Sequence, residues 1–356
     1  MFDIFVFAGQ SNMMGASVLP PKHRLNICRS YEYRFSPVMR GADKGSFVPV
    51  TYDCGEFLYK NPDAAYSTTD ENGKSTLADY GANADFVCAM CNLNDYDKKT
   101  VFPFAVYSES NHVPGASLPP YLCERWEALG GSAVIAHIAK GGVNINHFFS
   151  ADMENRYNSE LNKRFDGKYQ PVRPREHYGA AEVFDKKCLS LFSQAKDKYG
   201  ENELGEKILF WLQGENNSND SDDEYELKLE ILWNHAKALG FDKMMIIRIG
   251  YWWHKRLVNI MRAQERFCSH RDDCFIVTRA MSFMPDVYNV DCIDEWYTEK
   301  PQAEYYGCRD SFDGFNNNHI NEKGFMLIAD RTADNLWRIL KEGKQPTLEK
   351  DIVRGI

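Results

Sequence analysis

Five short apolar runs, separated by segments with helical periodicity, constrain the fold of this chain more than any other feature. The runs span residues 3–8, 133–139, 207–212, 244–249 and 275–279, and polar or turn residues bound each of them. Apolar residues recur with helical spacing in six segments, at 84–93, 119–128, 180–198, 222–238, 256–267 and 323–341. Alternating strands and helices predict an α/β fold with a central five-stranded parallel sheet covered on both faces.

Two stretches interrupt this alternation. Residues 15–80 are polar and contain glycine and proline without clear periodicity, which predicts small strands, turns and loops that face a substrate. Residues 150–176 are interpreted as a second, irregular insertion. Because no internal repeat or low-complexity linker divides the chain, we expect a single domain over residues 1–345, followed by a C-terminal tail at 346–356.

The composition excludes several classes of protein. A formal net charge of -9, with no clustered basic run, argues against a nucleic-acid partner and favours a neutral or sugar-like substrate. No apolar stretch approaches the roughly 18 residues of a membrane span, and no basic segment precedes an apolar run at the N-terminus. We therefore expect a cytoplasmic protein that is not inserted in a membrane, and its oligomeric state is left open.

The cysteines do not suggest a disulfide framework or a metal site. The ten cysteines are scattered, and several lie in apolar segments, which is typical of reduced, packed thiols. Cys88 and Cys91 form one CxxC pair inside the helical segment 84–93, but no second pair supplies zinc ligands. The acidic run 220–226 is interpreted as the first turn of a helix. We therefore expect no metal and no organic cofactor.

A serine stands where the first apolar run ends. Residues 8–15 read Ala-Gly-Gln-Ser-Asn-Met-Met-Gly, so Ser11 lies at the carboxyl edge of the sheet, where open α/β folds bind ligands. Gly9 and Gly15 permit a tight turn, and the backbone N–H groups of the following helix are suited to bind an oxyanion. A serine that only caps a helix gives the same local pattern, so this segment alone leaves both interpretations open.

Three further segments extend the pattern. Residues 138–145 (Ile-Ala-Lys-Gly-Gly-Val-Asn-Ile) follow the second apolar run, and residues 211–215 (Trp-Leu-Gln-Gly-Glu) follow the third. His319 precedes the C-terminal helical segment, with Gly324 five residues later. Together with residues 9–13 (Gly-Gln-Ser-Asn-Met), these motifs resemble the SGNH hydrolases. The likeness is to the carbohydrate O-acetylesterases, which include sialate O-acetylesterases and family-six acetylxylan esterases. Arg262-Ala263-Gln264 is similar to a further motif of this family but carries little weight.

The resemblance covers nearly the whole chain and implies a role for each motif. It implies a three-layer, flavodoxin-like SGNH fold that hydrolyses acetyl esters on carbohydrate through an acyl-serine intermediate. Ser11 is then the nucleophile and His319 its general base, because a serine hydroxyl is a weak nucleophile until an imidazole takes its proton. The implied oxyanion donors are the N–H of Ser11, the N–H of Gly141 or Gly142, and the side chain of Gln213. The alternative for Gln213 is a buried amide that satisfies a loop.

One position departs from the family pattern. SGNH enzymes carry an aspartate three residues before the histidine, and this chain has Asn316 there. An asparagine oxygen can accept the imidazole N–H but cannot offset the charge that forms on His319. We favour Glu215 as the replacement carboxylate because it adjoins Gln213. Asp313 is the alternative, although an aspartate before glycine is also typical of a turn.

Other residues are candidates for substrate binding. Residues of the matched motifs expected to contact a sugar are Gln10, Asn12, Asn144 and His147. Trp252 and His254 form a polar and aromatic cluster that suits carbohydrate, although core packing explains it equally well. The lost aspartate also permits a carbohydrate-binding pseudoenzyme. A sugar O-acetyltransferase that uses the same acyl-serine is a further alternative.

Overall fold

The structure is a computed structural model, and it describes residues 1–15, 23–34, 45–50, 116–139, 142–172, 179–252, 255–283, 309–312 and 315–350. The helical segment expected at 84–93 and its CxxC pair lie outside these residues. Gly141, His254 and Asp313 also lie outside them, and of Trp252 and Asn316 only the backbone is described.

The central sheet has seven strands rather than the five predicted, in the order β3-β2-β4-β1-β5-β6-β9. All five predicted strands are present: β1 (Phe2–Gly9), β4 (Ala133–Ala139), β5 (Leu204–Leu212), β6 (Lys243–Ile247) and β9 (Cys274–Thr278). These five pair in parallel. Counted along the chain they lie in the order 2-1-3-4-5, which is the strand order of flavodoxin-like sheets.

The two additional strands, β2 (Tyr31–Arg34) and β3 (Ser46–Pro49), extend one edge of the sheet. They belong to the interval 15–80, where small strands were expected, but they were not expected to join the central sheet. Each has four residues, and β2 joins β4 through only two residue pairs. Strands this short, with polar residues such as Glu32 and Arg34, carry no continuous apolar run. The pattern that predicts buried strands therefore does not detect them.

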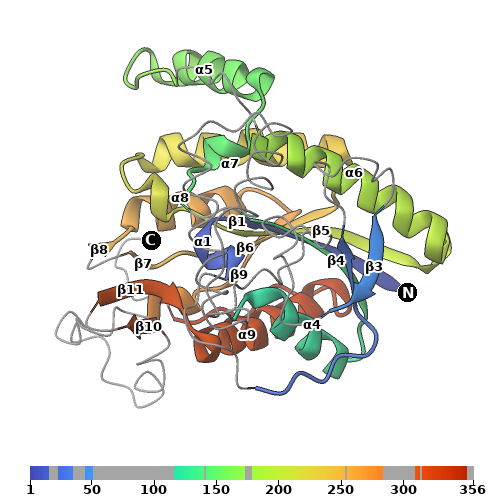
Figure 1. Ribbon diagram of the computed structural model, residues 1–356. Coiled ribbons are helices and arrows are strands. Elements are labelled where there is room, and N and C mark those ends of the chain that lie inside the picture. The colour runs from blue at the N-terminus through green and yellow to red at the C-terminus, as the bar shows by residue number, and fades with distance from the viewer. Residues whose placement is uncertain are drawn as a thin grey trace, which may run out of the picture.

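Helices cover both faces of the sheet, so the architecture has three layers (Figure 1). On one face, α4 (Leu118–Ala128) packs against α9 (Glu322–Leu340). The other face carries α6 (Gly179–Tyr199), α7 (Asp222–Leu239) and α8 (Val258–Ser269). All five correspond to predicted helices. Because β1 lies inside the sheet between these layers, residues 4–8 are all 0% exposed.

Helix α5 (Ala151–Phe165) corrects the prediction that residues 150–176 are irregular. The side chain of Ser150 caps its first turn, and Met153, Tyr157 and Leu161 are buried on the face that meets α7. These apolar residues recur only every fourth position, so the apolar stripe is narrow and the segment is polar overall. In Figure 1 this helix lies outside the layer formed by α6, α7 and α8.

The remaining elements are short. They are α1 (Ser11–Met14), η2 (Ile145–Phe148), η3 (Glu201–Glu203), η4 (Glu215–Asn217), η5 (Ala280–Phe283), and the hairpins β7–β8 (Tyr251–Trp252 and Lys255–Arg256) and β10–β11 (Arg309–Phe312 and Phe315–Ile320). None of the helices in the described ranges combines the length and the apolar character needed to cross a bilayer.

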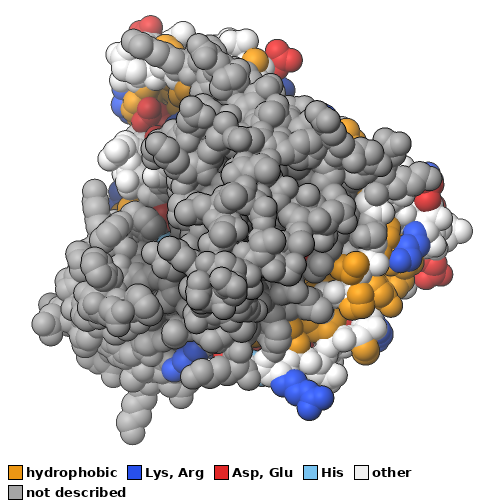
Figure 2. All heavy atoms as spheres, in the orientation of Figure 1, with side chains coloured by type: hydrophobic (Ala, Val, Ile, Leu, Met, Phe, Trp, Pro, Cys, Tyr) orange, Lys and Arg blue, Asp and Glu red, His pale blue; other side chains and the backbone are white. Residues whose placement is uncertain are grey.

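Aromatic rings gather at the edge of the sheet where β2 and β3 lie. Tyr199 contacts the rings of Phe2 and Phe47 at centroid distances of 4.5 and 5.5 Å. The amine of Lys198 lies 4.7 Å from the centre of the Phe47 ring. Figure 2 shows hydrophobic side chains at this side of the molecule, to the right of the view. The C-terminal end of α6 thus packs against rings carried by β1 and β3.

The five cysteines in the described ranges are free thiols, as expected. Four of them are buried: Cys123, Cys188, Cys268 and Cys274. Burial raises the pKa of the Cys188 and Cys268 thiols well above the ordinary value, so both stay protonated and unreactive.

Candidate active site

Ser11 follows the carboxyl end of β1 and begins α1. Gly9 makes this position possible, because a Cβ at Gly9 would lie 2.0 Å from the carbonyl oxygen of Leu212 at the end of β5. The N–H of Gln10 donates to the same oxygen at 3.2 Å. The ends of β1 and β5 therefore meet closely, and Ser11 is held there with 2% of its surface exposed.

The motif that follows β5 turns sharply toward Ser11. Gly214 has a φ of 152°, and a Cβ there would lie 2.7 Å from side-chain atoms of both Ile249 and Ile260. The chain then enters η4, which begins with Glu215. Glycine is needed here for both conformation and space, and the turn carries Glu215, 1% exposed, back toward β1.

Asn12 connects the nucleophile motif to two other parts of the site. Its Nδ2 donates to Oε1 of Glu215 at 2.8 Å, and its Oδ1 accepts from the backbone N–H of Ile320 at 3.0 Å. Asn12 follows Ser11, and Ile320 directly follows His319 on β11. The hydrogen bond between Asn12 and Ile320 therefore brings the predicted nucleophile and base to the same edge of the sheet.

The position of His319 is fixed by the start of α9. His319 is half-buried on β11, and Asn321 caps α9 by accepting from the N–H of Gly324 at 3.1 Å. Oε1 of Glu322 accepts from the Tyr121 hydroxyl at 2.9 Å. The glycine five residues after the histidine thus contributes the N–H that caps the helix, and Glu322 ties the helix start to α4.

Gln213 is 0% exposed and lies among three of the motifs. Its Nε2 lies within hydrogen-bonding distance of Oδ1 of Asn217 at 2.7 Å, Oε1 of Gln10 at 3.2 Å and the carbonyl oxygen of Val143 at 3.2 Å. Its Oε1 accepts from the Tyr225 hydroxyl at 2.8 Å. The N–H groups of this amide therefore have acceptors inside the protein, as in the alternative of a buried, satisfied amide.

Several residues that support Gln213 were not predicted from the sequence. Oδ1 of Asn217 also accepts from the N–H of Ile145 at 3.0 Å, and its Nδ2 donates to Asp220 at 2.7 Å. Lys228 is bonded to the same carboxylate at 2.7 Å. Asn217 thereby links the motif after β4 to the motif after β5. The sequence signal that could have pointed to Asn217 was its position, two residues beyond the Gln-Gly-Glu string.

Two further side chains hold the backbone of Gln213. The hydroxyl of Tyr225 shares its one proton between Oε1 and the carbonyl oxygen of Gln213, each 2.8 Å away, and Nε2 of Gln264 donates to the same carbonyl oxygen at 3.0 Å. Burial raises the pKa of Tyr225 well above the ordinary value, so the hydroxyl remains a donor. Gln264 belongs to the Arg-Ala-Gln string, whose likeness to a family motif carried little weight in the sequence.

The predicted substrate-binding residues differ in accessibility. Asn144 and His147 are half-buried, and Oδ1 of Asn144 lies 3.1 Å from Nδ1 of His147. Gln10 is 1% exposed and Asn12 is 0% exposed. Gly142, one of the two predicted oxyanion donors, is exposed and has a φ of 68°. Asn12 has no accessible surface with which to contact a substrate.

Within the described part of the chain, no three His, Cys, Asp or Glu side chains are grouped so that they could hold a metal ion. The acidic run 220–226 lies at the N-terminus of α7, as predicted, with Asp222, Asp223 and Glu224 in the first turn. Ser221 and Glu224 make a capping box there. Arg266 pairs with Asp222, Asp223 and Glu226 of the same turn.

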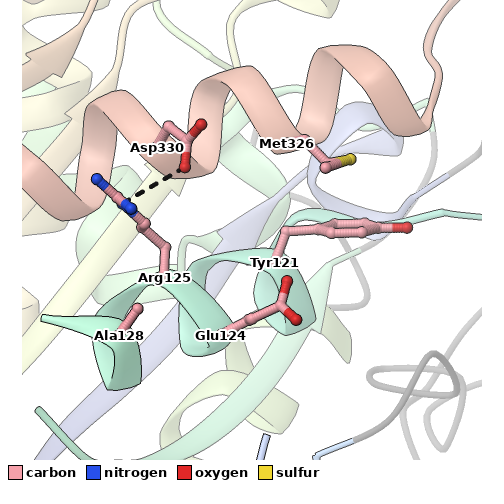
Figure 3. Close-up of a pocket in the computed structure, with 6 residues that line it drawn as sticks. All are labelled: Tyr121, Glu124, Arg125, Ala128, Met326 and Asp330. Carbon is pink, nitrogen blue, oxygen red and sulfur yellow. Dashed lines mark ion pairs between the residues drawn. The ribbon is translucent and has the colours of Figure 1, made fainter. Parts of the chain in front are cut away.

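A cleft of about 230 Å³ lies between α4 and α9, away from these motifs. Figure 3 shows Tyr121 and Glu124 of α4 facing Met326 and Asp330 of α9. The guanidinium of Arg125 pairs with Asp330 across it at 3.5 Å. None of the predicted site residues lines this cleft.

Comparison with protein-family models and with curated proteins gives no match to this chain. Among solved structures, a protein from Arabidopsis thaliana aligns with a TM-score of 0.48 and 12% identity over 95% of this chain and 98% of its own. NanS aligns with a TM-score of 0.47 and 13% identity over 96% and 98%. A carbohydrate acetylesterase from Xanthomonas citri aligns with a TM-score of 0.42 and 12% identity over 96% of this chain and 57% of its own.

Proposed function

We propose that this chain is a carbohydrate O-acetylesterase of the SGNH type, with Ser11 as nucleophile and His319 as general base. The observation that carries the proposal is the meeting of the four sequence motifs at one end of the sheet. Gln213 is bonded to Gln10 and to the carbonyl of Val143, while Asn12 is bonded to Glu215 and to the residue after His319. Motifs far apart in the sequence are thus joined around one serine.

The proposed reaction gives each of these residues a role. His319 takes the proton of the Ser11 hydroxyl as Oγ attacks the acetyl carbonyl carbon, and the N–H groups of Ser11 and Gly142 stabilise the oxyanion. Collapse breaks the bond between the acetyl carbon and the sugar oxygen, and His319 returns the proton to that oxygen, which leaves as a hydroxyl. Water, activated by His319, then releases acetate from Ser11. Gln213 joins as a third donor when one of its internal hydrogen bonds is exchanged for the oxyanion.

Acetate release tests the assignment. Wild-type protein should release acetate from acetylated sialic acids, acetylated xylo-oligosaccharides or aryl acetates, and Ser11→Ala should lower turnover by at least about 1,000-fold, because it removes the nucleophile. Octanoyl aryl esters should react more slowly than acetyl esters. The melting temperature of Ser11→Ala should match the wild type. A folded Ser11→Ala variant that keeps more than a few per cent of the activity would remove Ser11 as nucleophile.

Asn316 at the usual aspartate position favours one other function, that of a carbohydrate-binding pseudoenzyme. The same assays separate the two. Binding of an acetylated sugar by calorimetry without any acetate release would establish the pseudoenzyme. Transfer of acetyl to an added sugar acceptor, measured in the same reactions, would instead establish the acetyltransferase.

A further inference from the structure

Asn12 contacts both the carboxylate proposed to support the base and the strand that carries the base. Its side chain is 0% exposed. Nδ2 donates to Oε1 of Glu215 at 2.8 Å, and Oδ1 accepts from the N–H of Ile320 at 3.0 Å. Because Asn12 follows Ser11 and Ile320 follows His319, any shift of this amide displaces the two reacting side chains relative to each other.

Chemistry fixes the orientation of this amide. A backbone N–H only donates, and an ionised carboxylate only accepts. Flipping the amide would place its NH₂ group against the N–H of Ile320, so that hydrogen bond would become a repulsive contact in a buried environment. The N–H of Ile320 therefore selects one orientation of Asn12, and that orientation points the NH₂ group at Glu215.

We propose that Asn12 is a positioning residue that aligns His319 with Ser11, and that Glu215 acts on the base through Asn12. This inference rests on the proposed function in taking Ser11 and His319 as the reacting pair. It assigns Asn12 no contact with substrate, in agreement with its complete burial. A misalignment of about 1 Å lowers turnover by about 100-fold, so this single amide can control the rate.

A pair of substitutions tests the hydrogen bond itself. Asn12→Asp keeps the acceptor for Ile320 but places a carboxylate against Glu215. Adding Glu215→Gln restores a donor opposite the new acceptor. We expect Asn12→Asp to lower kcat for an aryl acetate by about 100-fold with KM within about twofold, and the double variant to regain at least about tenfold.

Asn335 provides a matched control in α9. It is a buried amide that likewise joins separate segments, donating to the carbonyl oxygens of Val277 and Thr347 at 2.8 and 2.9 Å and accepting from the N–H of Thr347 at 2.7 Å. Asn335→Asp should lower the melting temperature and leave kcat at the wild-type value. Where Asn12→Asp does not fold, Asn12→Ser gives the same comparison, since one hydroxyl cannot reach both partners.

Labelling of Ser11 by a fluorophosphonate tests the positioning role of Asn12 without assuming that an acetylated sugar is the substrate. If Asn12→Asp slows labelling and the double variant restores it, the positioning role stands even when no acetylated sugar is hydrolysed. If Asn12→Asp labels and turns over at wild-type rates, the positioning role is overturned while the esterase assignment stands. If wild-type Ser11 is not labelled at all, the activated serine is absent and both fail.

Discussion

Side-chain amides, more than charged groups, organise the candidate site at the scale of single residues. Asn12, Gln213 and Gln264 are each 0% exposed, and Gln10 and Asn217 are at most 3% exposed. Each amide joins segments distant in sequence, as in the bond from Gln213 to Gln10, which are 203 residues apart. An amide can both donate and accept without the desolvation cost of a charge. A buried network of amides therefore fixes the orientation of the groups that it joins.

Glu215 is the carboxylate expected to offset the charge that forms on His319 during attack. Glu215→Gln preserves the size of the side chain and an acceptor for Asn12 but removes the charge, so turnover should fall by about two to four orders of magnitude. Asn316→Ala should be mild. Steady-state kinetics on an aryl acetate provides the measurement.

Asp313, six residues before His319, is the alternative acid, and its substitution tests the opposite assignment. If Asp313→Asn abolishes turnover while Glu215→Gln stays near the wild-type rate in folded protein, Asp313 is the acid and Glu215 is structural. If all three variants remain active, His319 works as half of a dyad oriented by a backbone carbonyl.

Sequence alone could place Ser11 and Gln213 because both directly follow apolar strands, whose carboxyl ends meet at one edge. It could not show that Gln213 donates inside the protein, since that depends on Val143 and Asn217 reaching it from two separate turns. The burial of Asn12 likewise depends on residues from separate segments, Glu215 and Ile320, that pack against it. A motif specifies which residue stands at a strand end, whereas the direction of each polar bond depends on contacts that periodicity does not encode.

At the scale of elements, continuous or wide apolar patterns predicted the structure well and narrow ones did not. The segment 133–139 matches β4 residue for residue, and 222–238 differs from α7 by one residue at its end. Helix α5 was missed because it exposes most of its surface. Small strands were expected within 15–80, but β2 and β3 are too short for the apolar pattern to assign them to the central sheet. The sequence of α5 is dominated by solvent-facing positions, where helix, strand and loop use similar residues.

A bidentate ion pair joins α5 to α7 in addition to the buried apolar face of the helix. Arg164 binds both carboxylate oxygens of Glu230 on α7, at 2.8 and 2.9 Å. Because the Arg164 side chain is 41% exposed, Glu230→Gln should cost less than about 1 kcal/mol of global stability. It should nevertheless accelerate hydrogen exchange in residues 151–165, since α5 has few other contacts outside its buried face.

The same ion pair predicts a dependence on pH. The hydrogen bonds from Arg164 are the main cause that lowers the pKa of Glu230 below its ordinary value of 4.5. A lowered pKa gives stability that is present above pH 4.5 and is lost as the pH falls through the folded-state value. Protection of α5 should therefore decrease in acid in the wild type but not in Glu230→Gln. Equal protection in both proteins at neutral pH would show that the pair does not hold α5.

At the scale of the whole molecule, the first strand and the last helix are joined at two places. Near the site, the bond between Asn12 and Ile320 connects the end of β1 to the entrance of α9. At the opposite end of β1, Lys341 beyond α9 pairs with Asp3 at 3.2 Å. Residues at both ends of β1 are therefore bonded to the C-terminal part of the chain, and the charge state of Asp3 bears on the stability of the fold.

Asp3 predicts how that stability responds to acid. It is 2% exposed, and burial raises its pKa above the ordinary value of 3.8, with Lys341 opposing the shift. A raised pKa means that the folded state takes up the proton first, so the stability contributed at this site increases as the pH falls toward 3.8 and is lost as it rises. The unfolding free energy of the wild type, minus that of Asp3→Asn, should therefore grow in urea titrations from about pH 7 to about pH 4. Lys341→Met should make this slope steeper, because it removes the charge that opposes the shift. A difference that shrinks in acid would instead mean that Lys341 outweighs burial and that the pKa of Asp3 is lowered.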